Sequence, residues 1–186
     1  MCTPLRCRRI RFPAADSWTR SSVTMPVSGG GLTVTKESAD RSNRLATGGV
    51  EMVSGEHYIE VPITKDGASD GRHIMIGVTR PDLDLETYHY GTNNAWYLHP
   101  YSGGLYGQGK SNESPQGKLA VGDRVGVLLN LDEGWLRFYV NGKVFGPGFP
   151  SGVTGPVVIA VELIHVGEQV LLLPDAPKPP APGEHQ

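Results

Sequence analysis

The chain has 186 residues and a formal net charge of −2, with only 19% charged residues but 25 glycines and 15 prolines. This composition favours one domain of short strands and tight turns over long helices. No run approaches the roughly 18 apolar residues of a membrane span and no Lys/Arg stripe suits nucleic acid, so neither a membrane nor a nucleic acid is a predicted partner.

Residues 1–27 differ from the rest of the chain and are predicted to form a disordered basic leader. Within residues 1–24 a single acid, Asp16, is outnumbered by Arg6, Arg8, Arg9, Arg11 and Arg20. An Arg- and Ser-bearing segment that is poor in acids is also typical of organelle-targeting sequences. A third interpretation is extra sequence ahead of a start at Met25.

Both cysteines, Cys2 and Cys7, lie in this leader, and the predicted globular part has none. No histidine or cysteine elsewhere completes a zinc set with them, so no metal or cofactor is predicted. A fold without cysteines does not need an oxidising compartment, which favours the cytoplasm.

Residues 121–144 predict a β-hairpin and the opening of a third strand. Successive strand side chains point to opposite faces, so alternating apolar residues build one continuous buried surface. That surface is predicted to comprise Val125, Val127, Leu129, Leu131, Leu136, Phe138 and Val140. The dipeptide Asn141-Gly142 supplies the two positive-φ positions of a type I′ turn. The pattern is that of an all-β meander, which favours recognition by loops over catalysis.

The same residues resemble the SPRY domain family. The run DRVGVLLNLDEGWLRFYVNGK, residues 123–143, is similar to the central strand and hairpin of that family. Three other segments fit in the expected order: residues 55–61, with Ile59 where Trp is usual, residues 74–78 and residues 156–161. The resemblance implies a two-sheet antiparallel β-sandwich of the concanavalin-like, SPRY jelly-roll type.

The predicted domain organisation has three parts. Residues 1–27 are the leader, residues 28–173 the SPRY domain and residues 174–186 a Pro-rich disordered tail. Such a tail cannot build a strand and is expected to be extended. The domain is predicted to be monomeric.

Motifs of catalysis and metal binding are missing from the sequence. It has neither paired-histidine helix motifs nor a nucleophile elbow nor a phosphate loop. Asp132 and Glu133 are neighbours in a turn, so they cannot flank a glycosidic bond. The alternating acids Asp82, Asp84 and Glu86 have no glycine among them and do not match a calcium loop. We therefore do not expect an enzyme.

Residues 88–106 are the most informative for function. Tyrosine and tryptophan give large contact areas at low entropic cost, and asparagine offers a donor and an acceptor, so this composition is typical of recognition surfaces. Trp96 and Tyr97 are predicted to pack inside the domain. The predicted surface residues are Tyr88, Asn93, Asn94, Tyr101 and Tyr106.

The resemblance refines two positions. SPRY proteins with a SOCS box hold a short Asn-containing peptide with a tyrosine to which Tyr106 corresponds in the segment GLYGQGK, residues 104–110. A second wall of that pocket is a Trp after "Ala-Val". Here Glu162 follows Ala160-Val161 and is expected to favour a ligand with a donor or a positive charge.

The predicted function is that of a protein-interaction module. It is expected to bind an extended peptide or a loop of a partner through the loops at one end of the sandwich. Further contacts are predicted in the loop after Val161 and in an early loop with Arg41, Asn43 and Arg44. The alternative is a lectin-like carbohydrate-binding module, since lectins share this architecture and exposed aromatic rings suit sugars.

Overall fold

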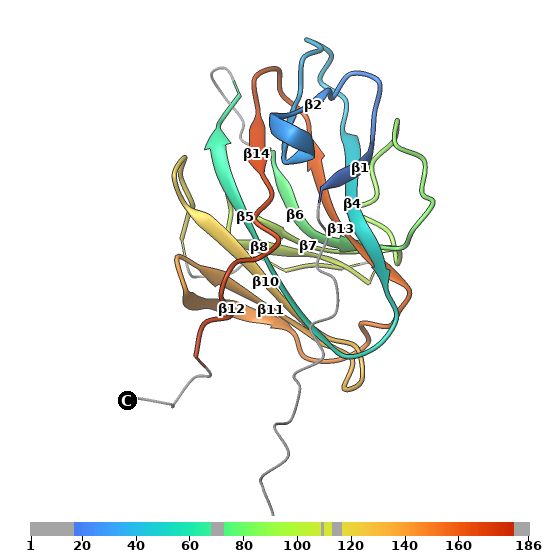
Figure 1. Cartoon of the computed structure of the whole chain (residues 1–186), viewed down its shortest axis with the longest axis vertical. Coiled ribbons are helices and arrows are strands. Elements are labelled where there is room, and N and C mark those ends of the chain that lie inside the picture. Colours follow the sequence, from blue (N-terminus) through green and yellow to red (C-terminus); the bar gives the residue numbers. More distant parts are fainter. Residues whose placement is uncertain (1–16, 68–72, 109, 113–116, 181–186) are drawn as a thin grey trace, which may run out of the picture.

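The computed structural model describes residues 17–67, 73–108, 110–112 and 117–180. These residues form two seven-stranded antiparallel sheets that share one hydrophobic core (Figure 1). The prediction of an all-β, two-sheet antiparallel sandwich is therefore confirmed. Among the described residues, no helix has the length and apolar character needed to cross a membrane.

Sheet I holds the strands that position the candidate site. Its order is β1 (Trp18–Ser21), β4 (Arg44–Met52), β13 (Val157–Leu163), β6 (Met75–Thr79), β7 (Ala95–His99), β8 (Gly104–Gly107) and β9 (Lys110–Asn112). Sheet II has the order β12 (Lys143–Phe149), β11 (Trp135–Val140), β10 (Arg124–Asn130), β5 (Glu56–Lys65), β14 (Gln169–Leu171), β3 (Thr33–Thr35) and β2 (Val27–Ser28). A 3-10 turn, η1 (Gly29–Gly31), joins β2 to β3.

The predicted hairpin is present as β10 and β11, with Val125 opposite Val140 and Leu129 opposite Leu136. Alternation places its apolar face in the core, where Phe138 is fully buried. Leu131 and Val140, at the margins of the core, are only partly buried. In the turn after β11, Asn141 has φ 51° and Gly142 has φ 80°. Two positive φ angles are what a type I′ turn requires.

The opposite face of this hairpin is less exposed than the alternation predicts. Tyr139 is buried there because the ring of Tyr58 from β5 packs edge-on against it, with ring centroids 6.1 Å apart. Arg137 is exposed, and its guanidinium lies 4.8 Å from the ring centroid of half-buried Trp135. An outer sheet face can therefore bury aromatic side chains when a neighbouring strand supplies a partner.

The expectation of a disordered leader over residues 1–27 is wrong for residues 17–27. Trp18 is only 4% exposed and Met25 is fully buried, and both belong to the core. β1 pairs with β4, and Trp18 Nε1 donates a 2.9 Å hydrogen bond to the carbonyl of Leu32. Burial of a large aromatic ring outweighs the basic, polar composition around it. Residues 1–16, with both cysteines, lie outside the described residues.

The beginning of the Pro-rich tail follows sheet II. Leu173 and Glu60 exchange backbone hydrogen bonds of 3.3 and 2.8 Å, which extends the pairing along β5. Residues 174–180, the described part of the tail, have no regular secondary structure, and Lys178 forms an ion pair with Glu56. Figure 1 shows this segment in red, passing in front of β10. The boundary at residue 173 stays a prediction, and residues 181–186 lie outside the described residues.

A second, smaller hydrophobic cluster covers the outer face of sheet I. The loop of residues 80–94, green beside β4 in Figure 1, packs Leu83 and Leu85 over this face. Beneath them lie Leu45, Met75, Ala95, Tyr97 and Ala160. The backbone N–H of Leu45 donates to the carbonyl of Leu85 at 2.9 Å. The loop is thus held against the start of β4, where the candidate site lies.

Candidate functional site

Two loops meet at the start of β4 and enclose a polar pocket of about 300 Å³, here called the loop pocket. One wall is the end of the 36–43 loop and the other belongs to the 80–94 loop. The lining residues are Arg41, Ser42, Asn43, Arg44, Glu86, Thr87 and Tyr88. The structure therefore brings together four of the residues predicted to bind a partner: Arg41, Asn43, Arg44 and Tyr88. This volume lies at the lower end of the range for ligand pockets.

Arg44 ties the two walls of the loop pocket together. Its Nε lies 3.0 Å from a carboxylate oxygen of Glu86 and its Nη2 lies 2.7 Å from one of Asp40. Nη1 donates to the carbonyls of Asn43 and Glu86 at 3.1 and 3.0 Å. A guanidinium held at so many points is a fixed part of the wall.

The 36–43 loop is anchored by a lysine that has no exposed surface. Lys36 is fully buried, and its Nζ donates to Ser38 and to the carboxylate of Asp40. The hydrogen bond from Lys36 is the largest of the effects that lower the pKa of Asp40 below its usual value. Asp40 thus bridges Lys36 and Arg44 from a single carboxylate.

Glu162 does not form the exposed pocket wall that was expected. It lies within β13 rather than in a loop, and its exposed fraction is 0%. Oε2 accepts a 3.0 Å hydrogen bond from Nδ2 of Asn43, and Oε1 accepts one of 2.7 Å from the backbone N–H of His89. Burial raises the pKa of Glu162, although both hydrogen bonds act in the opposite direction. Because groups of the same chain occupy its oxygens, the expected preference for a cationic ligand no longer follows.

Asn43 is also more deeply buried than expected. It contributes to the pocket lining, yet its side chain is nearly buried and its amide is directed at Glu162. Asn93 and Asn94 are exposed, but they lie where the 80–94 loop returns to β7 and do not line the loop pocket. The three asparagines are therefore not equivalent, and only Asn43 belongs to the pocket.

A row of rings, here called the aromatic strip, starts at the loop pocket. The ring centroids of Tyr88 and Tyr90 are 5.2 Å apart. Tyr90 packs edge-on against Tyr106, with ring centroids 5.8 Å apart. His99 then contacts Tyr106 at 5.7 Å and Tyr101 at 6.2 Å. Tyr88 is 56% exposed and Tyr101 37%, whereas Tyr106 is half-buried. Tyr106 therefore does not line the loop pocket, and its ring contacts Tyr90, which in turn contacts Tyr88 in the pocket wall.

The structure follows the predicted division of the aromatic residues except at Tyr106, which is half-buried and not on the open surface. Trp96 and Tyr97 are both buried, Trp96 toward the main core and Tyr97 in the smaller cluster. Burial and the neighbouring carboxylate of Glu162 raise the pKa of Tyr97 well above its usual value. Tyr88 and Tyr101 are exposed, as the sequence predicts.

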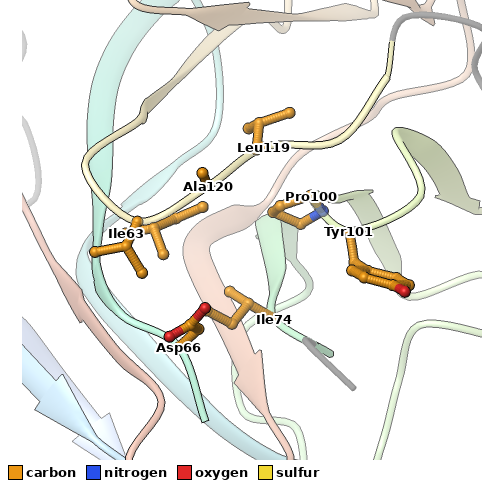
Figure 2. A pocket seen from close by; sticks show the side chains of 8 residues that line it. Ile63, Asp66, Ile74, Pro100, Tyr101, Leu119 and Ala120 are labelled. Atoms are coloured by element: carbon orange, nitrogen blue, oxygen red, sulfur yellow. The ribbon is translucent and has the colours of Figure 1, made fainter. Parts of the chain in front are cut away.

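A small apolar cavity of about 10 Å³ lies beside Tyr101. Figure 2 shows Leu119, Ala120, Pro100 and Ile74 around it, with Tyr101 at its edge. Such a volume holds at most one water molecule, and this lining offers water little to bond. The cavity is therefore a packing void and not a ligand site. The exposed ring of Tyr101 is instead covered in part by Lys118, whose Nζ lies 4.3 Å from the ring centroid.

Sequence reasoning missed a group of polar residues at this end of the sandwich. Glu168 is fully buried and accepts backbone N–H groups of His73, Ile164 and His165 at 3.0, 2.7 and 3.0 Å. The ring of His73 stacks on His99 and contacts His165, with both centroid distances 5.4 Å. No motif joins these residues in the sequence. Within the described part of the chain, no three His, Cys, Asp or Glu residues are arranged to hold a metal ion.

Comparison with known proteins assigns the family. The family model of the SPRY domain matches residues 56–172, which are more than half of the chain. Human SPRY domain-containing SOCS box protein 2 is 30% identical over 158 residues, which cover 75% of this chain and 58% of that protein. The Set1 complex component ash2 of Schizosaccharomyces pombe is 34% identical over 103 residues, or 50% of this chain and 14% of that protein. The chain thus spans less than two thirds of either relative.

A solved human SPRY domain has the same fold. It superposes with a TM-score of 0.71 at 21% identity, covering 86% of this chain and 99% of that one. The family match includes the central hairpin, β13 and the 80–94 loop, whereas the 36–43 loop and β4 lie before it in the chain. The chain belongs to the SPRY domain family.

Proposed function

We propose that this SPRY domain binds an extended peptide or a loop of a partner protein through the loop pocket and the aromatic strip. SPRY domains are protein-interaction modules, and the SOCS-box relative carries such a domain. The observation that carries the proposal is the position of Tyr88, which lines the loop pocket and also begins the aromatic strip.

The two parts of the site offer different chemistry to a ligand. The loop pocket presents the hydroxyls of Ser42 and Thr87 and the exposed side chain of Arg41. The strip presents partly exposed tyrosine rings, whose burial supplies most of the affinity at hot spots. One polar side chain of a partner seated in the pocket would fix the register, while neighbouring residues lie on the rings.

The length of the strip suits a short peptide. Four successive ring contacts of 5.2 to 6.2 Å lead from Tyr88 to Tyr101. About seven residues of extended chain, at ~3.3 Å each, follow such a path. The proposed ligand is therefore a segment of about this length, bound without a cofactor. We further propose that the domain acts as a monomeric adaptor in the cytoplasm and not as an enzyme.

A peptide-display selection on the whole chain tests the proposal, followed by calorimetric titration of the selected peptide. Tyr88→Ala is expected to weaken binding by about 2 kcal/mol, the scale of a hot-spot aromatic. Arg137→Ala is the control, because Arg137 is exposed on sheet II, away from the site. Equal losses for the two variants would contradict the proposed site.

A glycan array run in parallel addresses the carbohydrate alternative. Exposed tyrosine rings also stack on sugars, so Tyr88 and Tyr101 alone do not separate the two ligand classes. Selection of peptides whose binding depends on Tyr88, with no glycan bound, supports the proposal. Glycan binding that depends on Tyr88, with no peptide selected, would overturn it.

A further inference from the structure

A single buried carboxylate joins the two walls of the loop pocket from below. Glu162 accepts the side-chain amide of Asn43, from the 36–43 loop, and the backbone N–H of His89, from the 80–94 loop. Glu162 itself is fixed in β13, where it pairs with Leu45 of β4 and Met75 of β6. The two loops therefore share one attachment point near the end of β13, beside the starts of β4 and β6.

We propose that Glu162 is a positioning residue that sets the separation of the two loops forming the loop pocket. An effect of Glu162 on binding rests on the proposed function of the pocket. Its effect on the separation of the loops does not. A ligand would never touch Glu162, yet it would meet a pocket whose width depends on it.

The energetics of the site support a strong attachment. Glu162 has no exposed surface, and Asn43 and His89 are also buried. A buried donor that loses its acceptor cannot turn to solvent, so removing the carboxylate leaves two unsatisfied groups. Hydrogen bonds to an ionised acceptor are also stronger than those between neutral groups.

Glu168 and Glu60, the other buried carboxylates in the described part of the chain, do not have this arrangement. Glu168 accepts three backbone N–H groups, two of them from its own loop at Ile164 and His165. Glu60 lies on sheet II, where it accepts the hydroxyl of Tyr58 at 2.8 Å. The side-chain partners of these two carboxylates do not belong to the walls of the loop pocket, so Glu60 offers a matched control.

The titratable groups around Glu162 come from two elements. The 80–94 loop contributes His89 and Tyr90, and β7 contributes Tyr97, while β4 and β6 present apolar side chains. The pKa of Glu162 is raised by burial. This carboxylate is therefore the acid among them whose protonation would weaken the attachment of both loops.

Hydrogen exchange on the ligand-free whole chain tests the inference directly. Glu162→Met keeps much of the side-chain volume but removes both acceptors. Exchange of backbone amides in residues 84–90 and 41–44 is expected to rise by about tenfold or more. Glu162→Gln should restore much of the protection at residues 84–90, because its amide oxygen still accepts the N–H of His89. Glu60→Met should leave both loops unchanged.

Asn43→Ala keeps the inference testable if Glu162→Met does not fold. It removes one attachment only, so residues 41–44 are expected to exchange faster while residues 84–90 keep their protection. Unchanged exchange in both loops of folded Glu162→Met, or in residues 41–44 of Asn43→Ala, would overturn the inference.

A binding measurement separates this inference from the proposed function. The probe is the peptide selected on the wild-type protein, whose affinity is expected to fall about tenfold in Glu162→Met. Loosened loops with unchanged affinity would support the positioning role and show that the loop pocket is not the binding site. Unchanged loops would overturn the positioning role whatever the peptide does.

Discussion

Asn43 and Glu162 lie 119 positions apart in the chain and are joined by a 3.0 Å hydrogen bond beneath the loop pocket. One belongs to an early loop and the other lies near the end of β13, an interior strand of sheet I. The shape of the candidate site therefore depends on a contact that forms only when the sandwich is complete.

The apolar face of the hairpin gives a prediction about stability. Phe138 is fully buried in the core, whereas Arg137 is exposed next to it. Phe138→Ala is expected to cost about 3 to 5 kcal/mol of unfolding free energy, and Arg137→Ala less than about 1 kcal/mol. Urea unfolding of the two variants measures the difference, and equal losses would mean that the faces are reversed.

The turn after β11 gives a second prediction. Gly142 has φ 80° in open surroundings, so a side chain there meets backbone strain and no collision. Gly142→Val is expected to lower the unfolding free energy by about 1 to 2 kcal/mol, because a β-branched residue resists positive φ. The control is Lys143→Val, at an exposed strand position, which should have little effect. A neutral Gly142→Val would rule out the type I′ turn.

A third prediction concerns Tyr106 in the middle of the aromatic strip. If the ligand binds along the strip, Tyr106→Ala is expected to weaken binding of the selected peptide by about 2 kcal/mol or more. This corresponds to a loss of affinity of roughly thirtyfold. Tyr106→Phe keeps the ring and should lose much less. Since Tyr106 is half-buried, thermal stability should fall less than in Phe138→Ala. Unfolding of Tyr106→Ala, or unchanged binding, would make Tyr106 part of the scaffold only.

Asp40 predicts acid sensitivity of the 36–43 loop. Its pKa in the folded state is lowered from 3.8, mainly by the hydrogen bond from Lys36. The folded chain therefore binds this proton less tightly than the unfolded chain. The stabilisation is complete above the unfolded pKa and is lost as the pH falls through the folded one. Asp40→Asn should reduce the acid dependence of urea unfolding below pH 3.8; an unchanged dependence would contradict the ion pair.

Glu162 predicts the opposite dependence on pH. Burial raises its folded-state pKa above 4.5, so the folded chain binds this proton more tightly than the unfolded chain. The contribution of Glu162 to the unfolding free energy should increase as the pH falls through the folded pKa toward 4.5. Glu162→Gln should remove that increase. The amide NMR signal of His89 should show a titration step in the wild type that this variant lacks. A step of the same size in both proteins would assign it to another group.

Local pattern was enough to predict the all-β class and the central hairpin, whereas the two-sheet architecture was implied by the resemblance. Two-residue periodicity and the Asn141-Gly142 turn predicted the hairpin of β10 and β11, because these signals depend on neighbours in the chain. The same reasoning failed at β1. Its four residues, Trp18–Ser21, are too short and polar for a periodic signal, and pairing with β4 and burial of Trp18 create the strand.

The candidate site was predicted only in part. Tyr88, Arg41 and Arg44 could be selected by residue type, since exposed aromatic and arginine side chains are typical of recognition surfaces. Glu162 was misplaced because its assignment rested on the resemblance, which implies a pocket wall at the residue after Ala160-Val161. Its burial depends on donors from Asn43 and His89, which no local pattern connects. Lys36 was missed for the same reason, since a buried lysine is recognised only with its partners.

The pairing of β1 with β4 has a consequence for how the domain avoids aggregation. β1 is the outermost strand of sheet I, and β4 lies behind it as an interior strand with neighbours on both sides. Without β1, the stretch of β4 that pairs with it, Ala46 to Gly48, would present unpaired N–H and C=O groups to solvent. Such an uncovered strand edge is a template for pairing with a strand of another molecule. The short strand that begins at Trp18 thus protects the edge of β4 from pairing with other molecules.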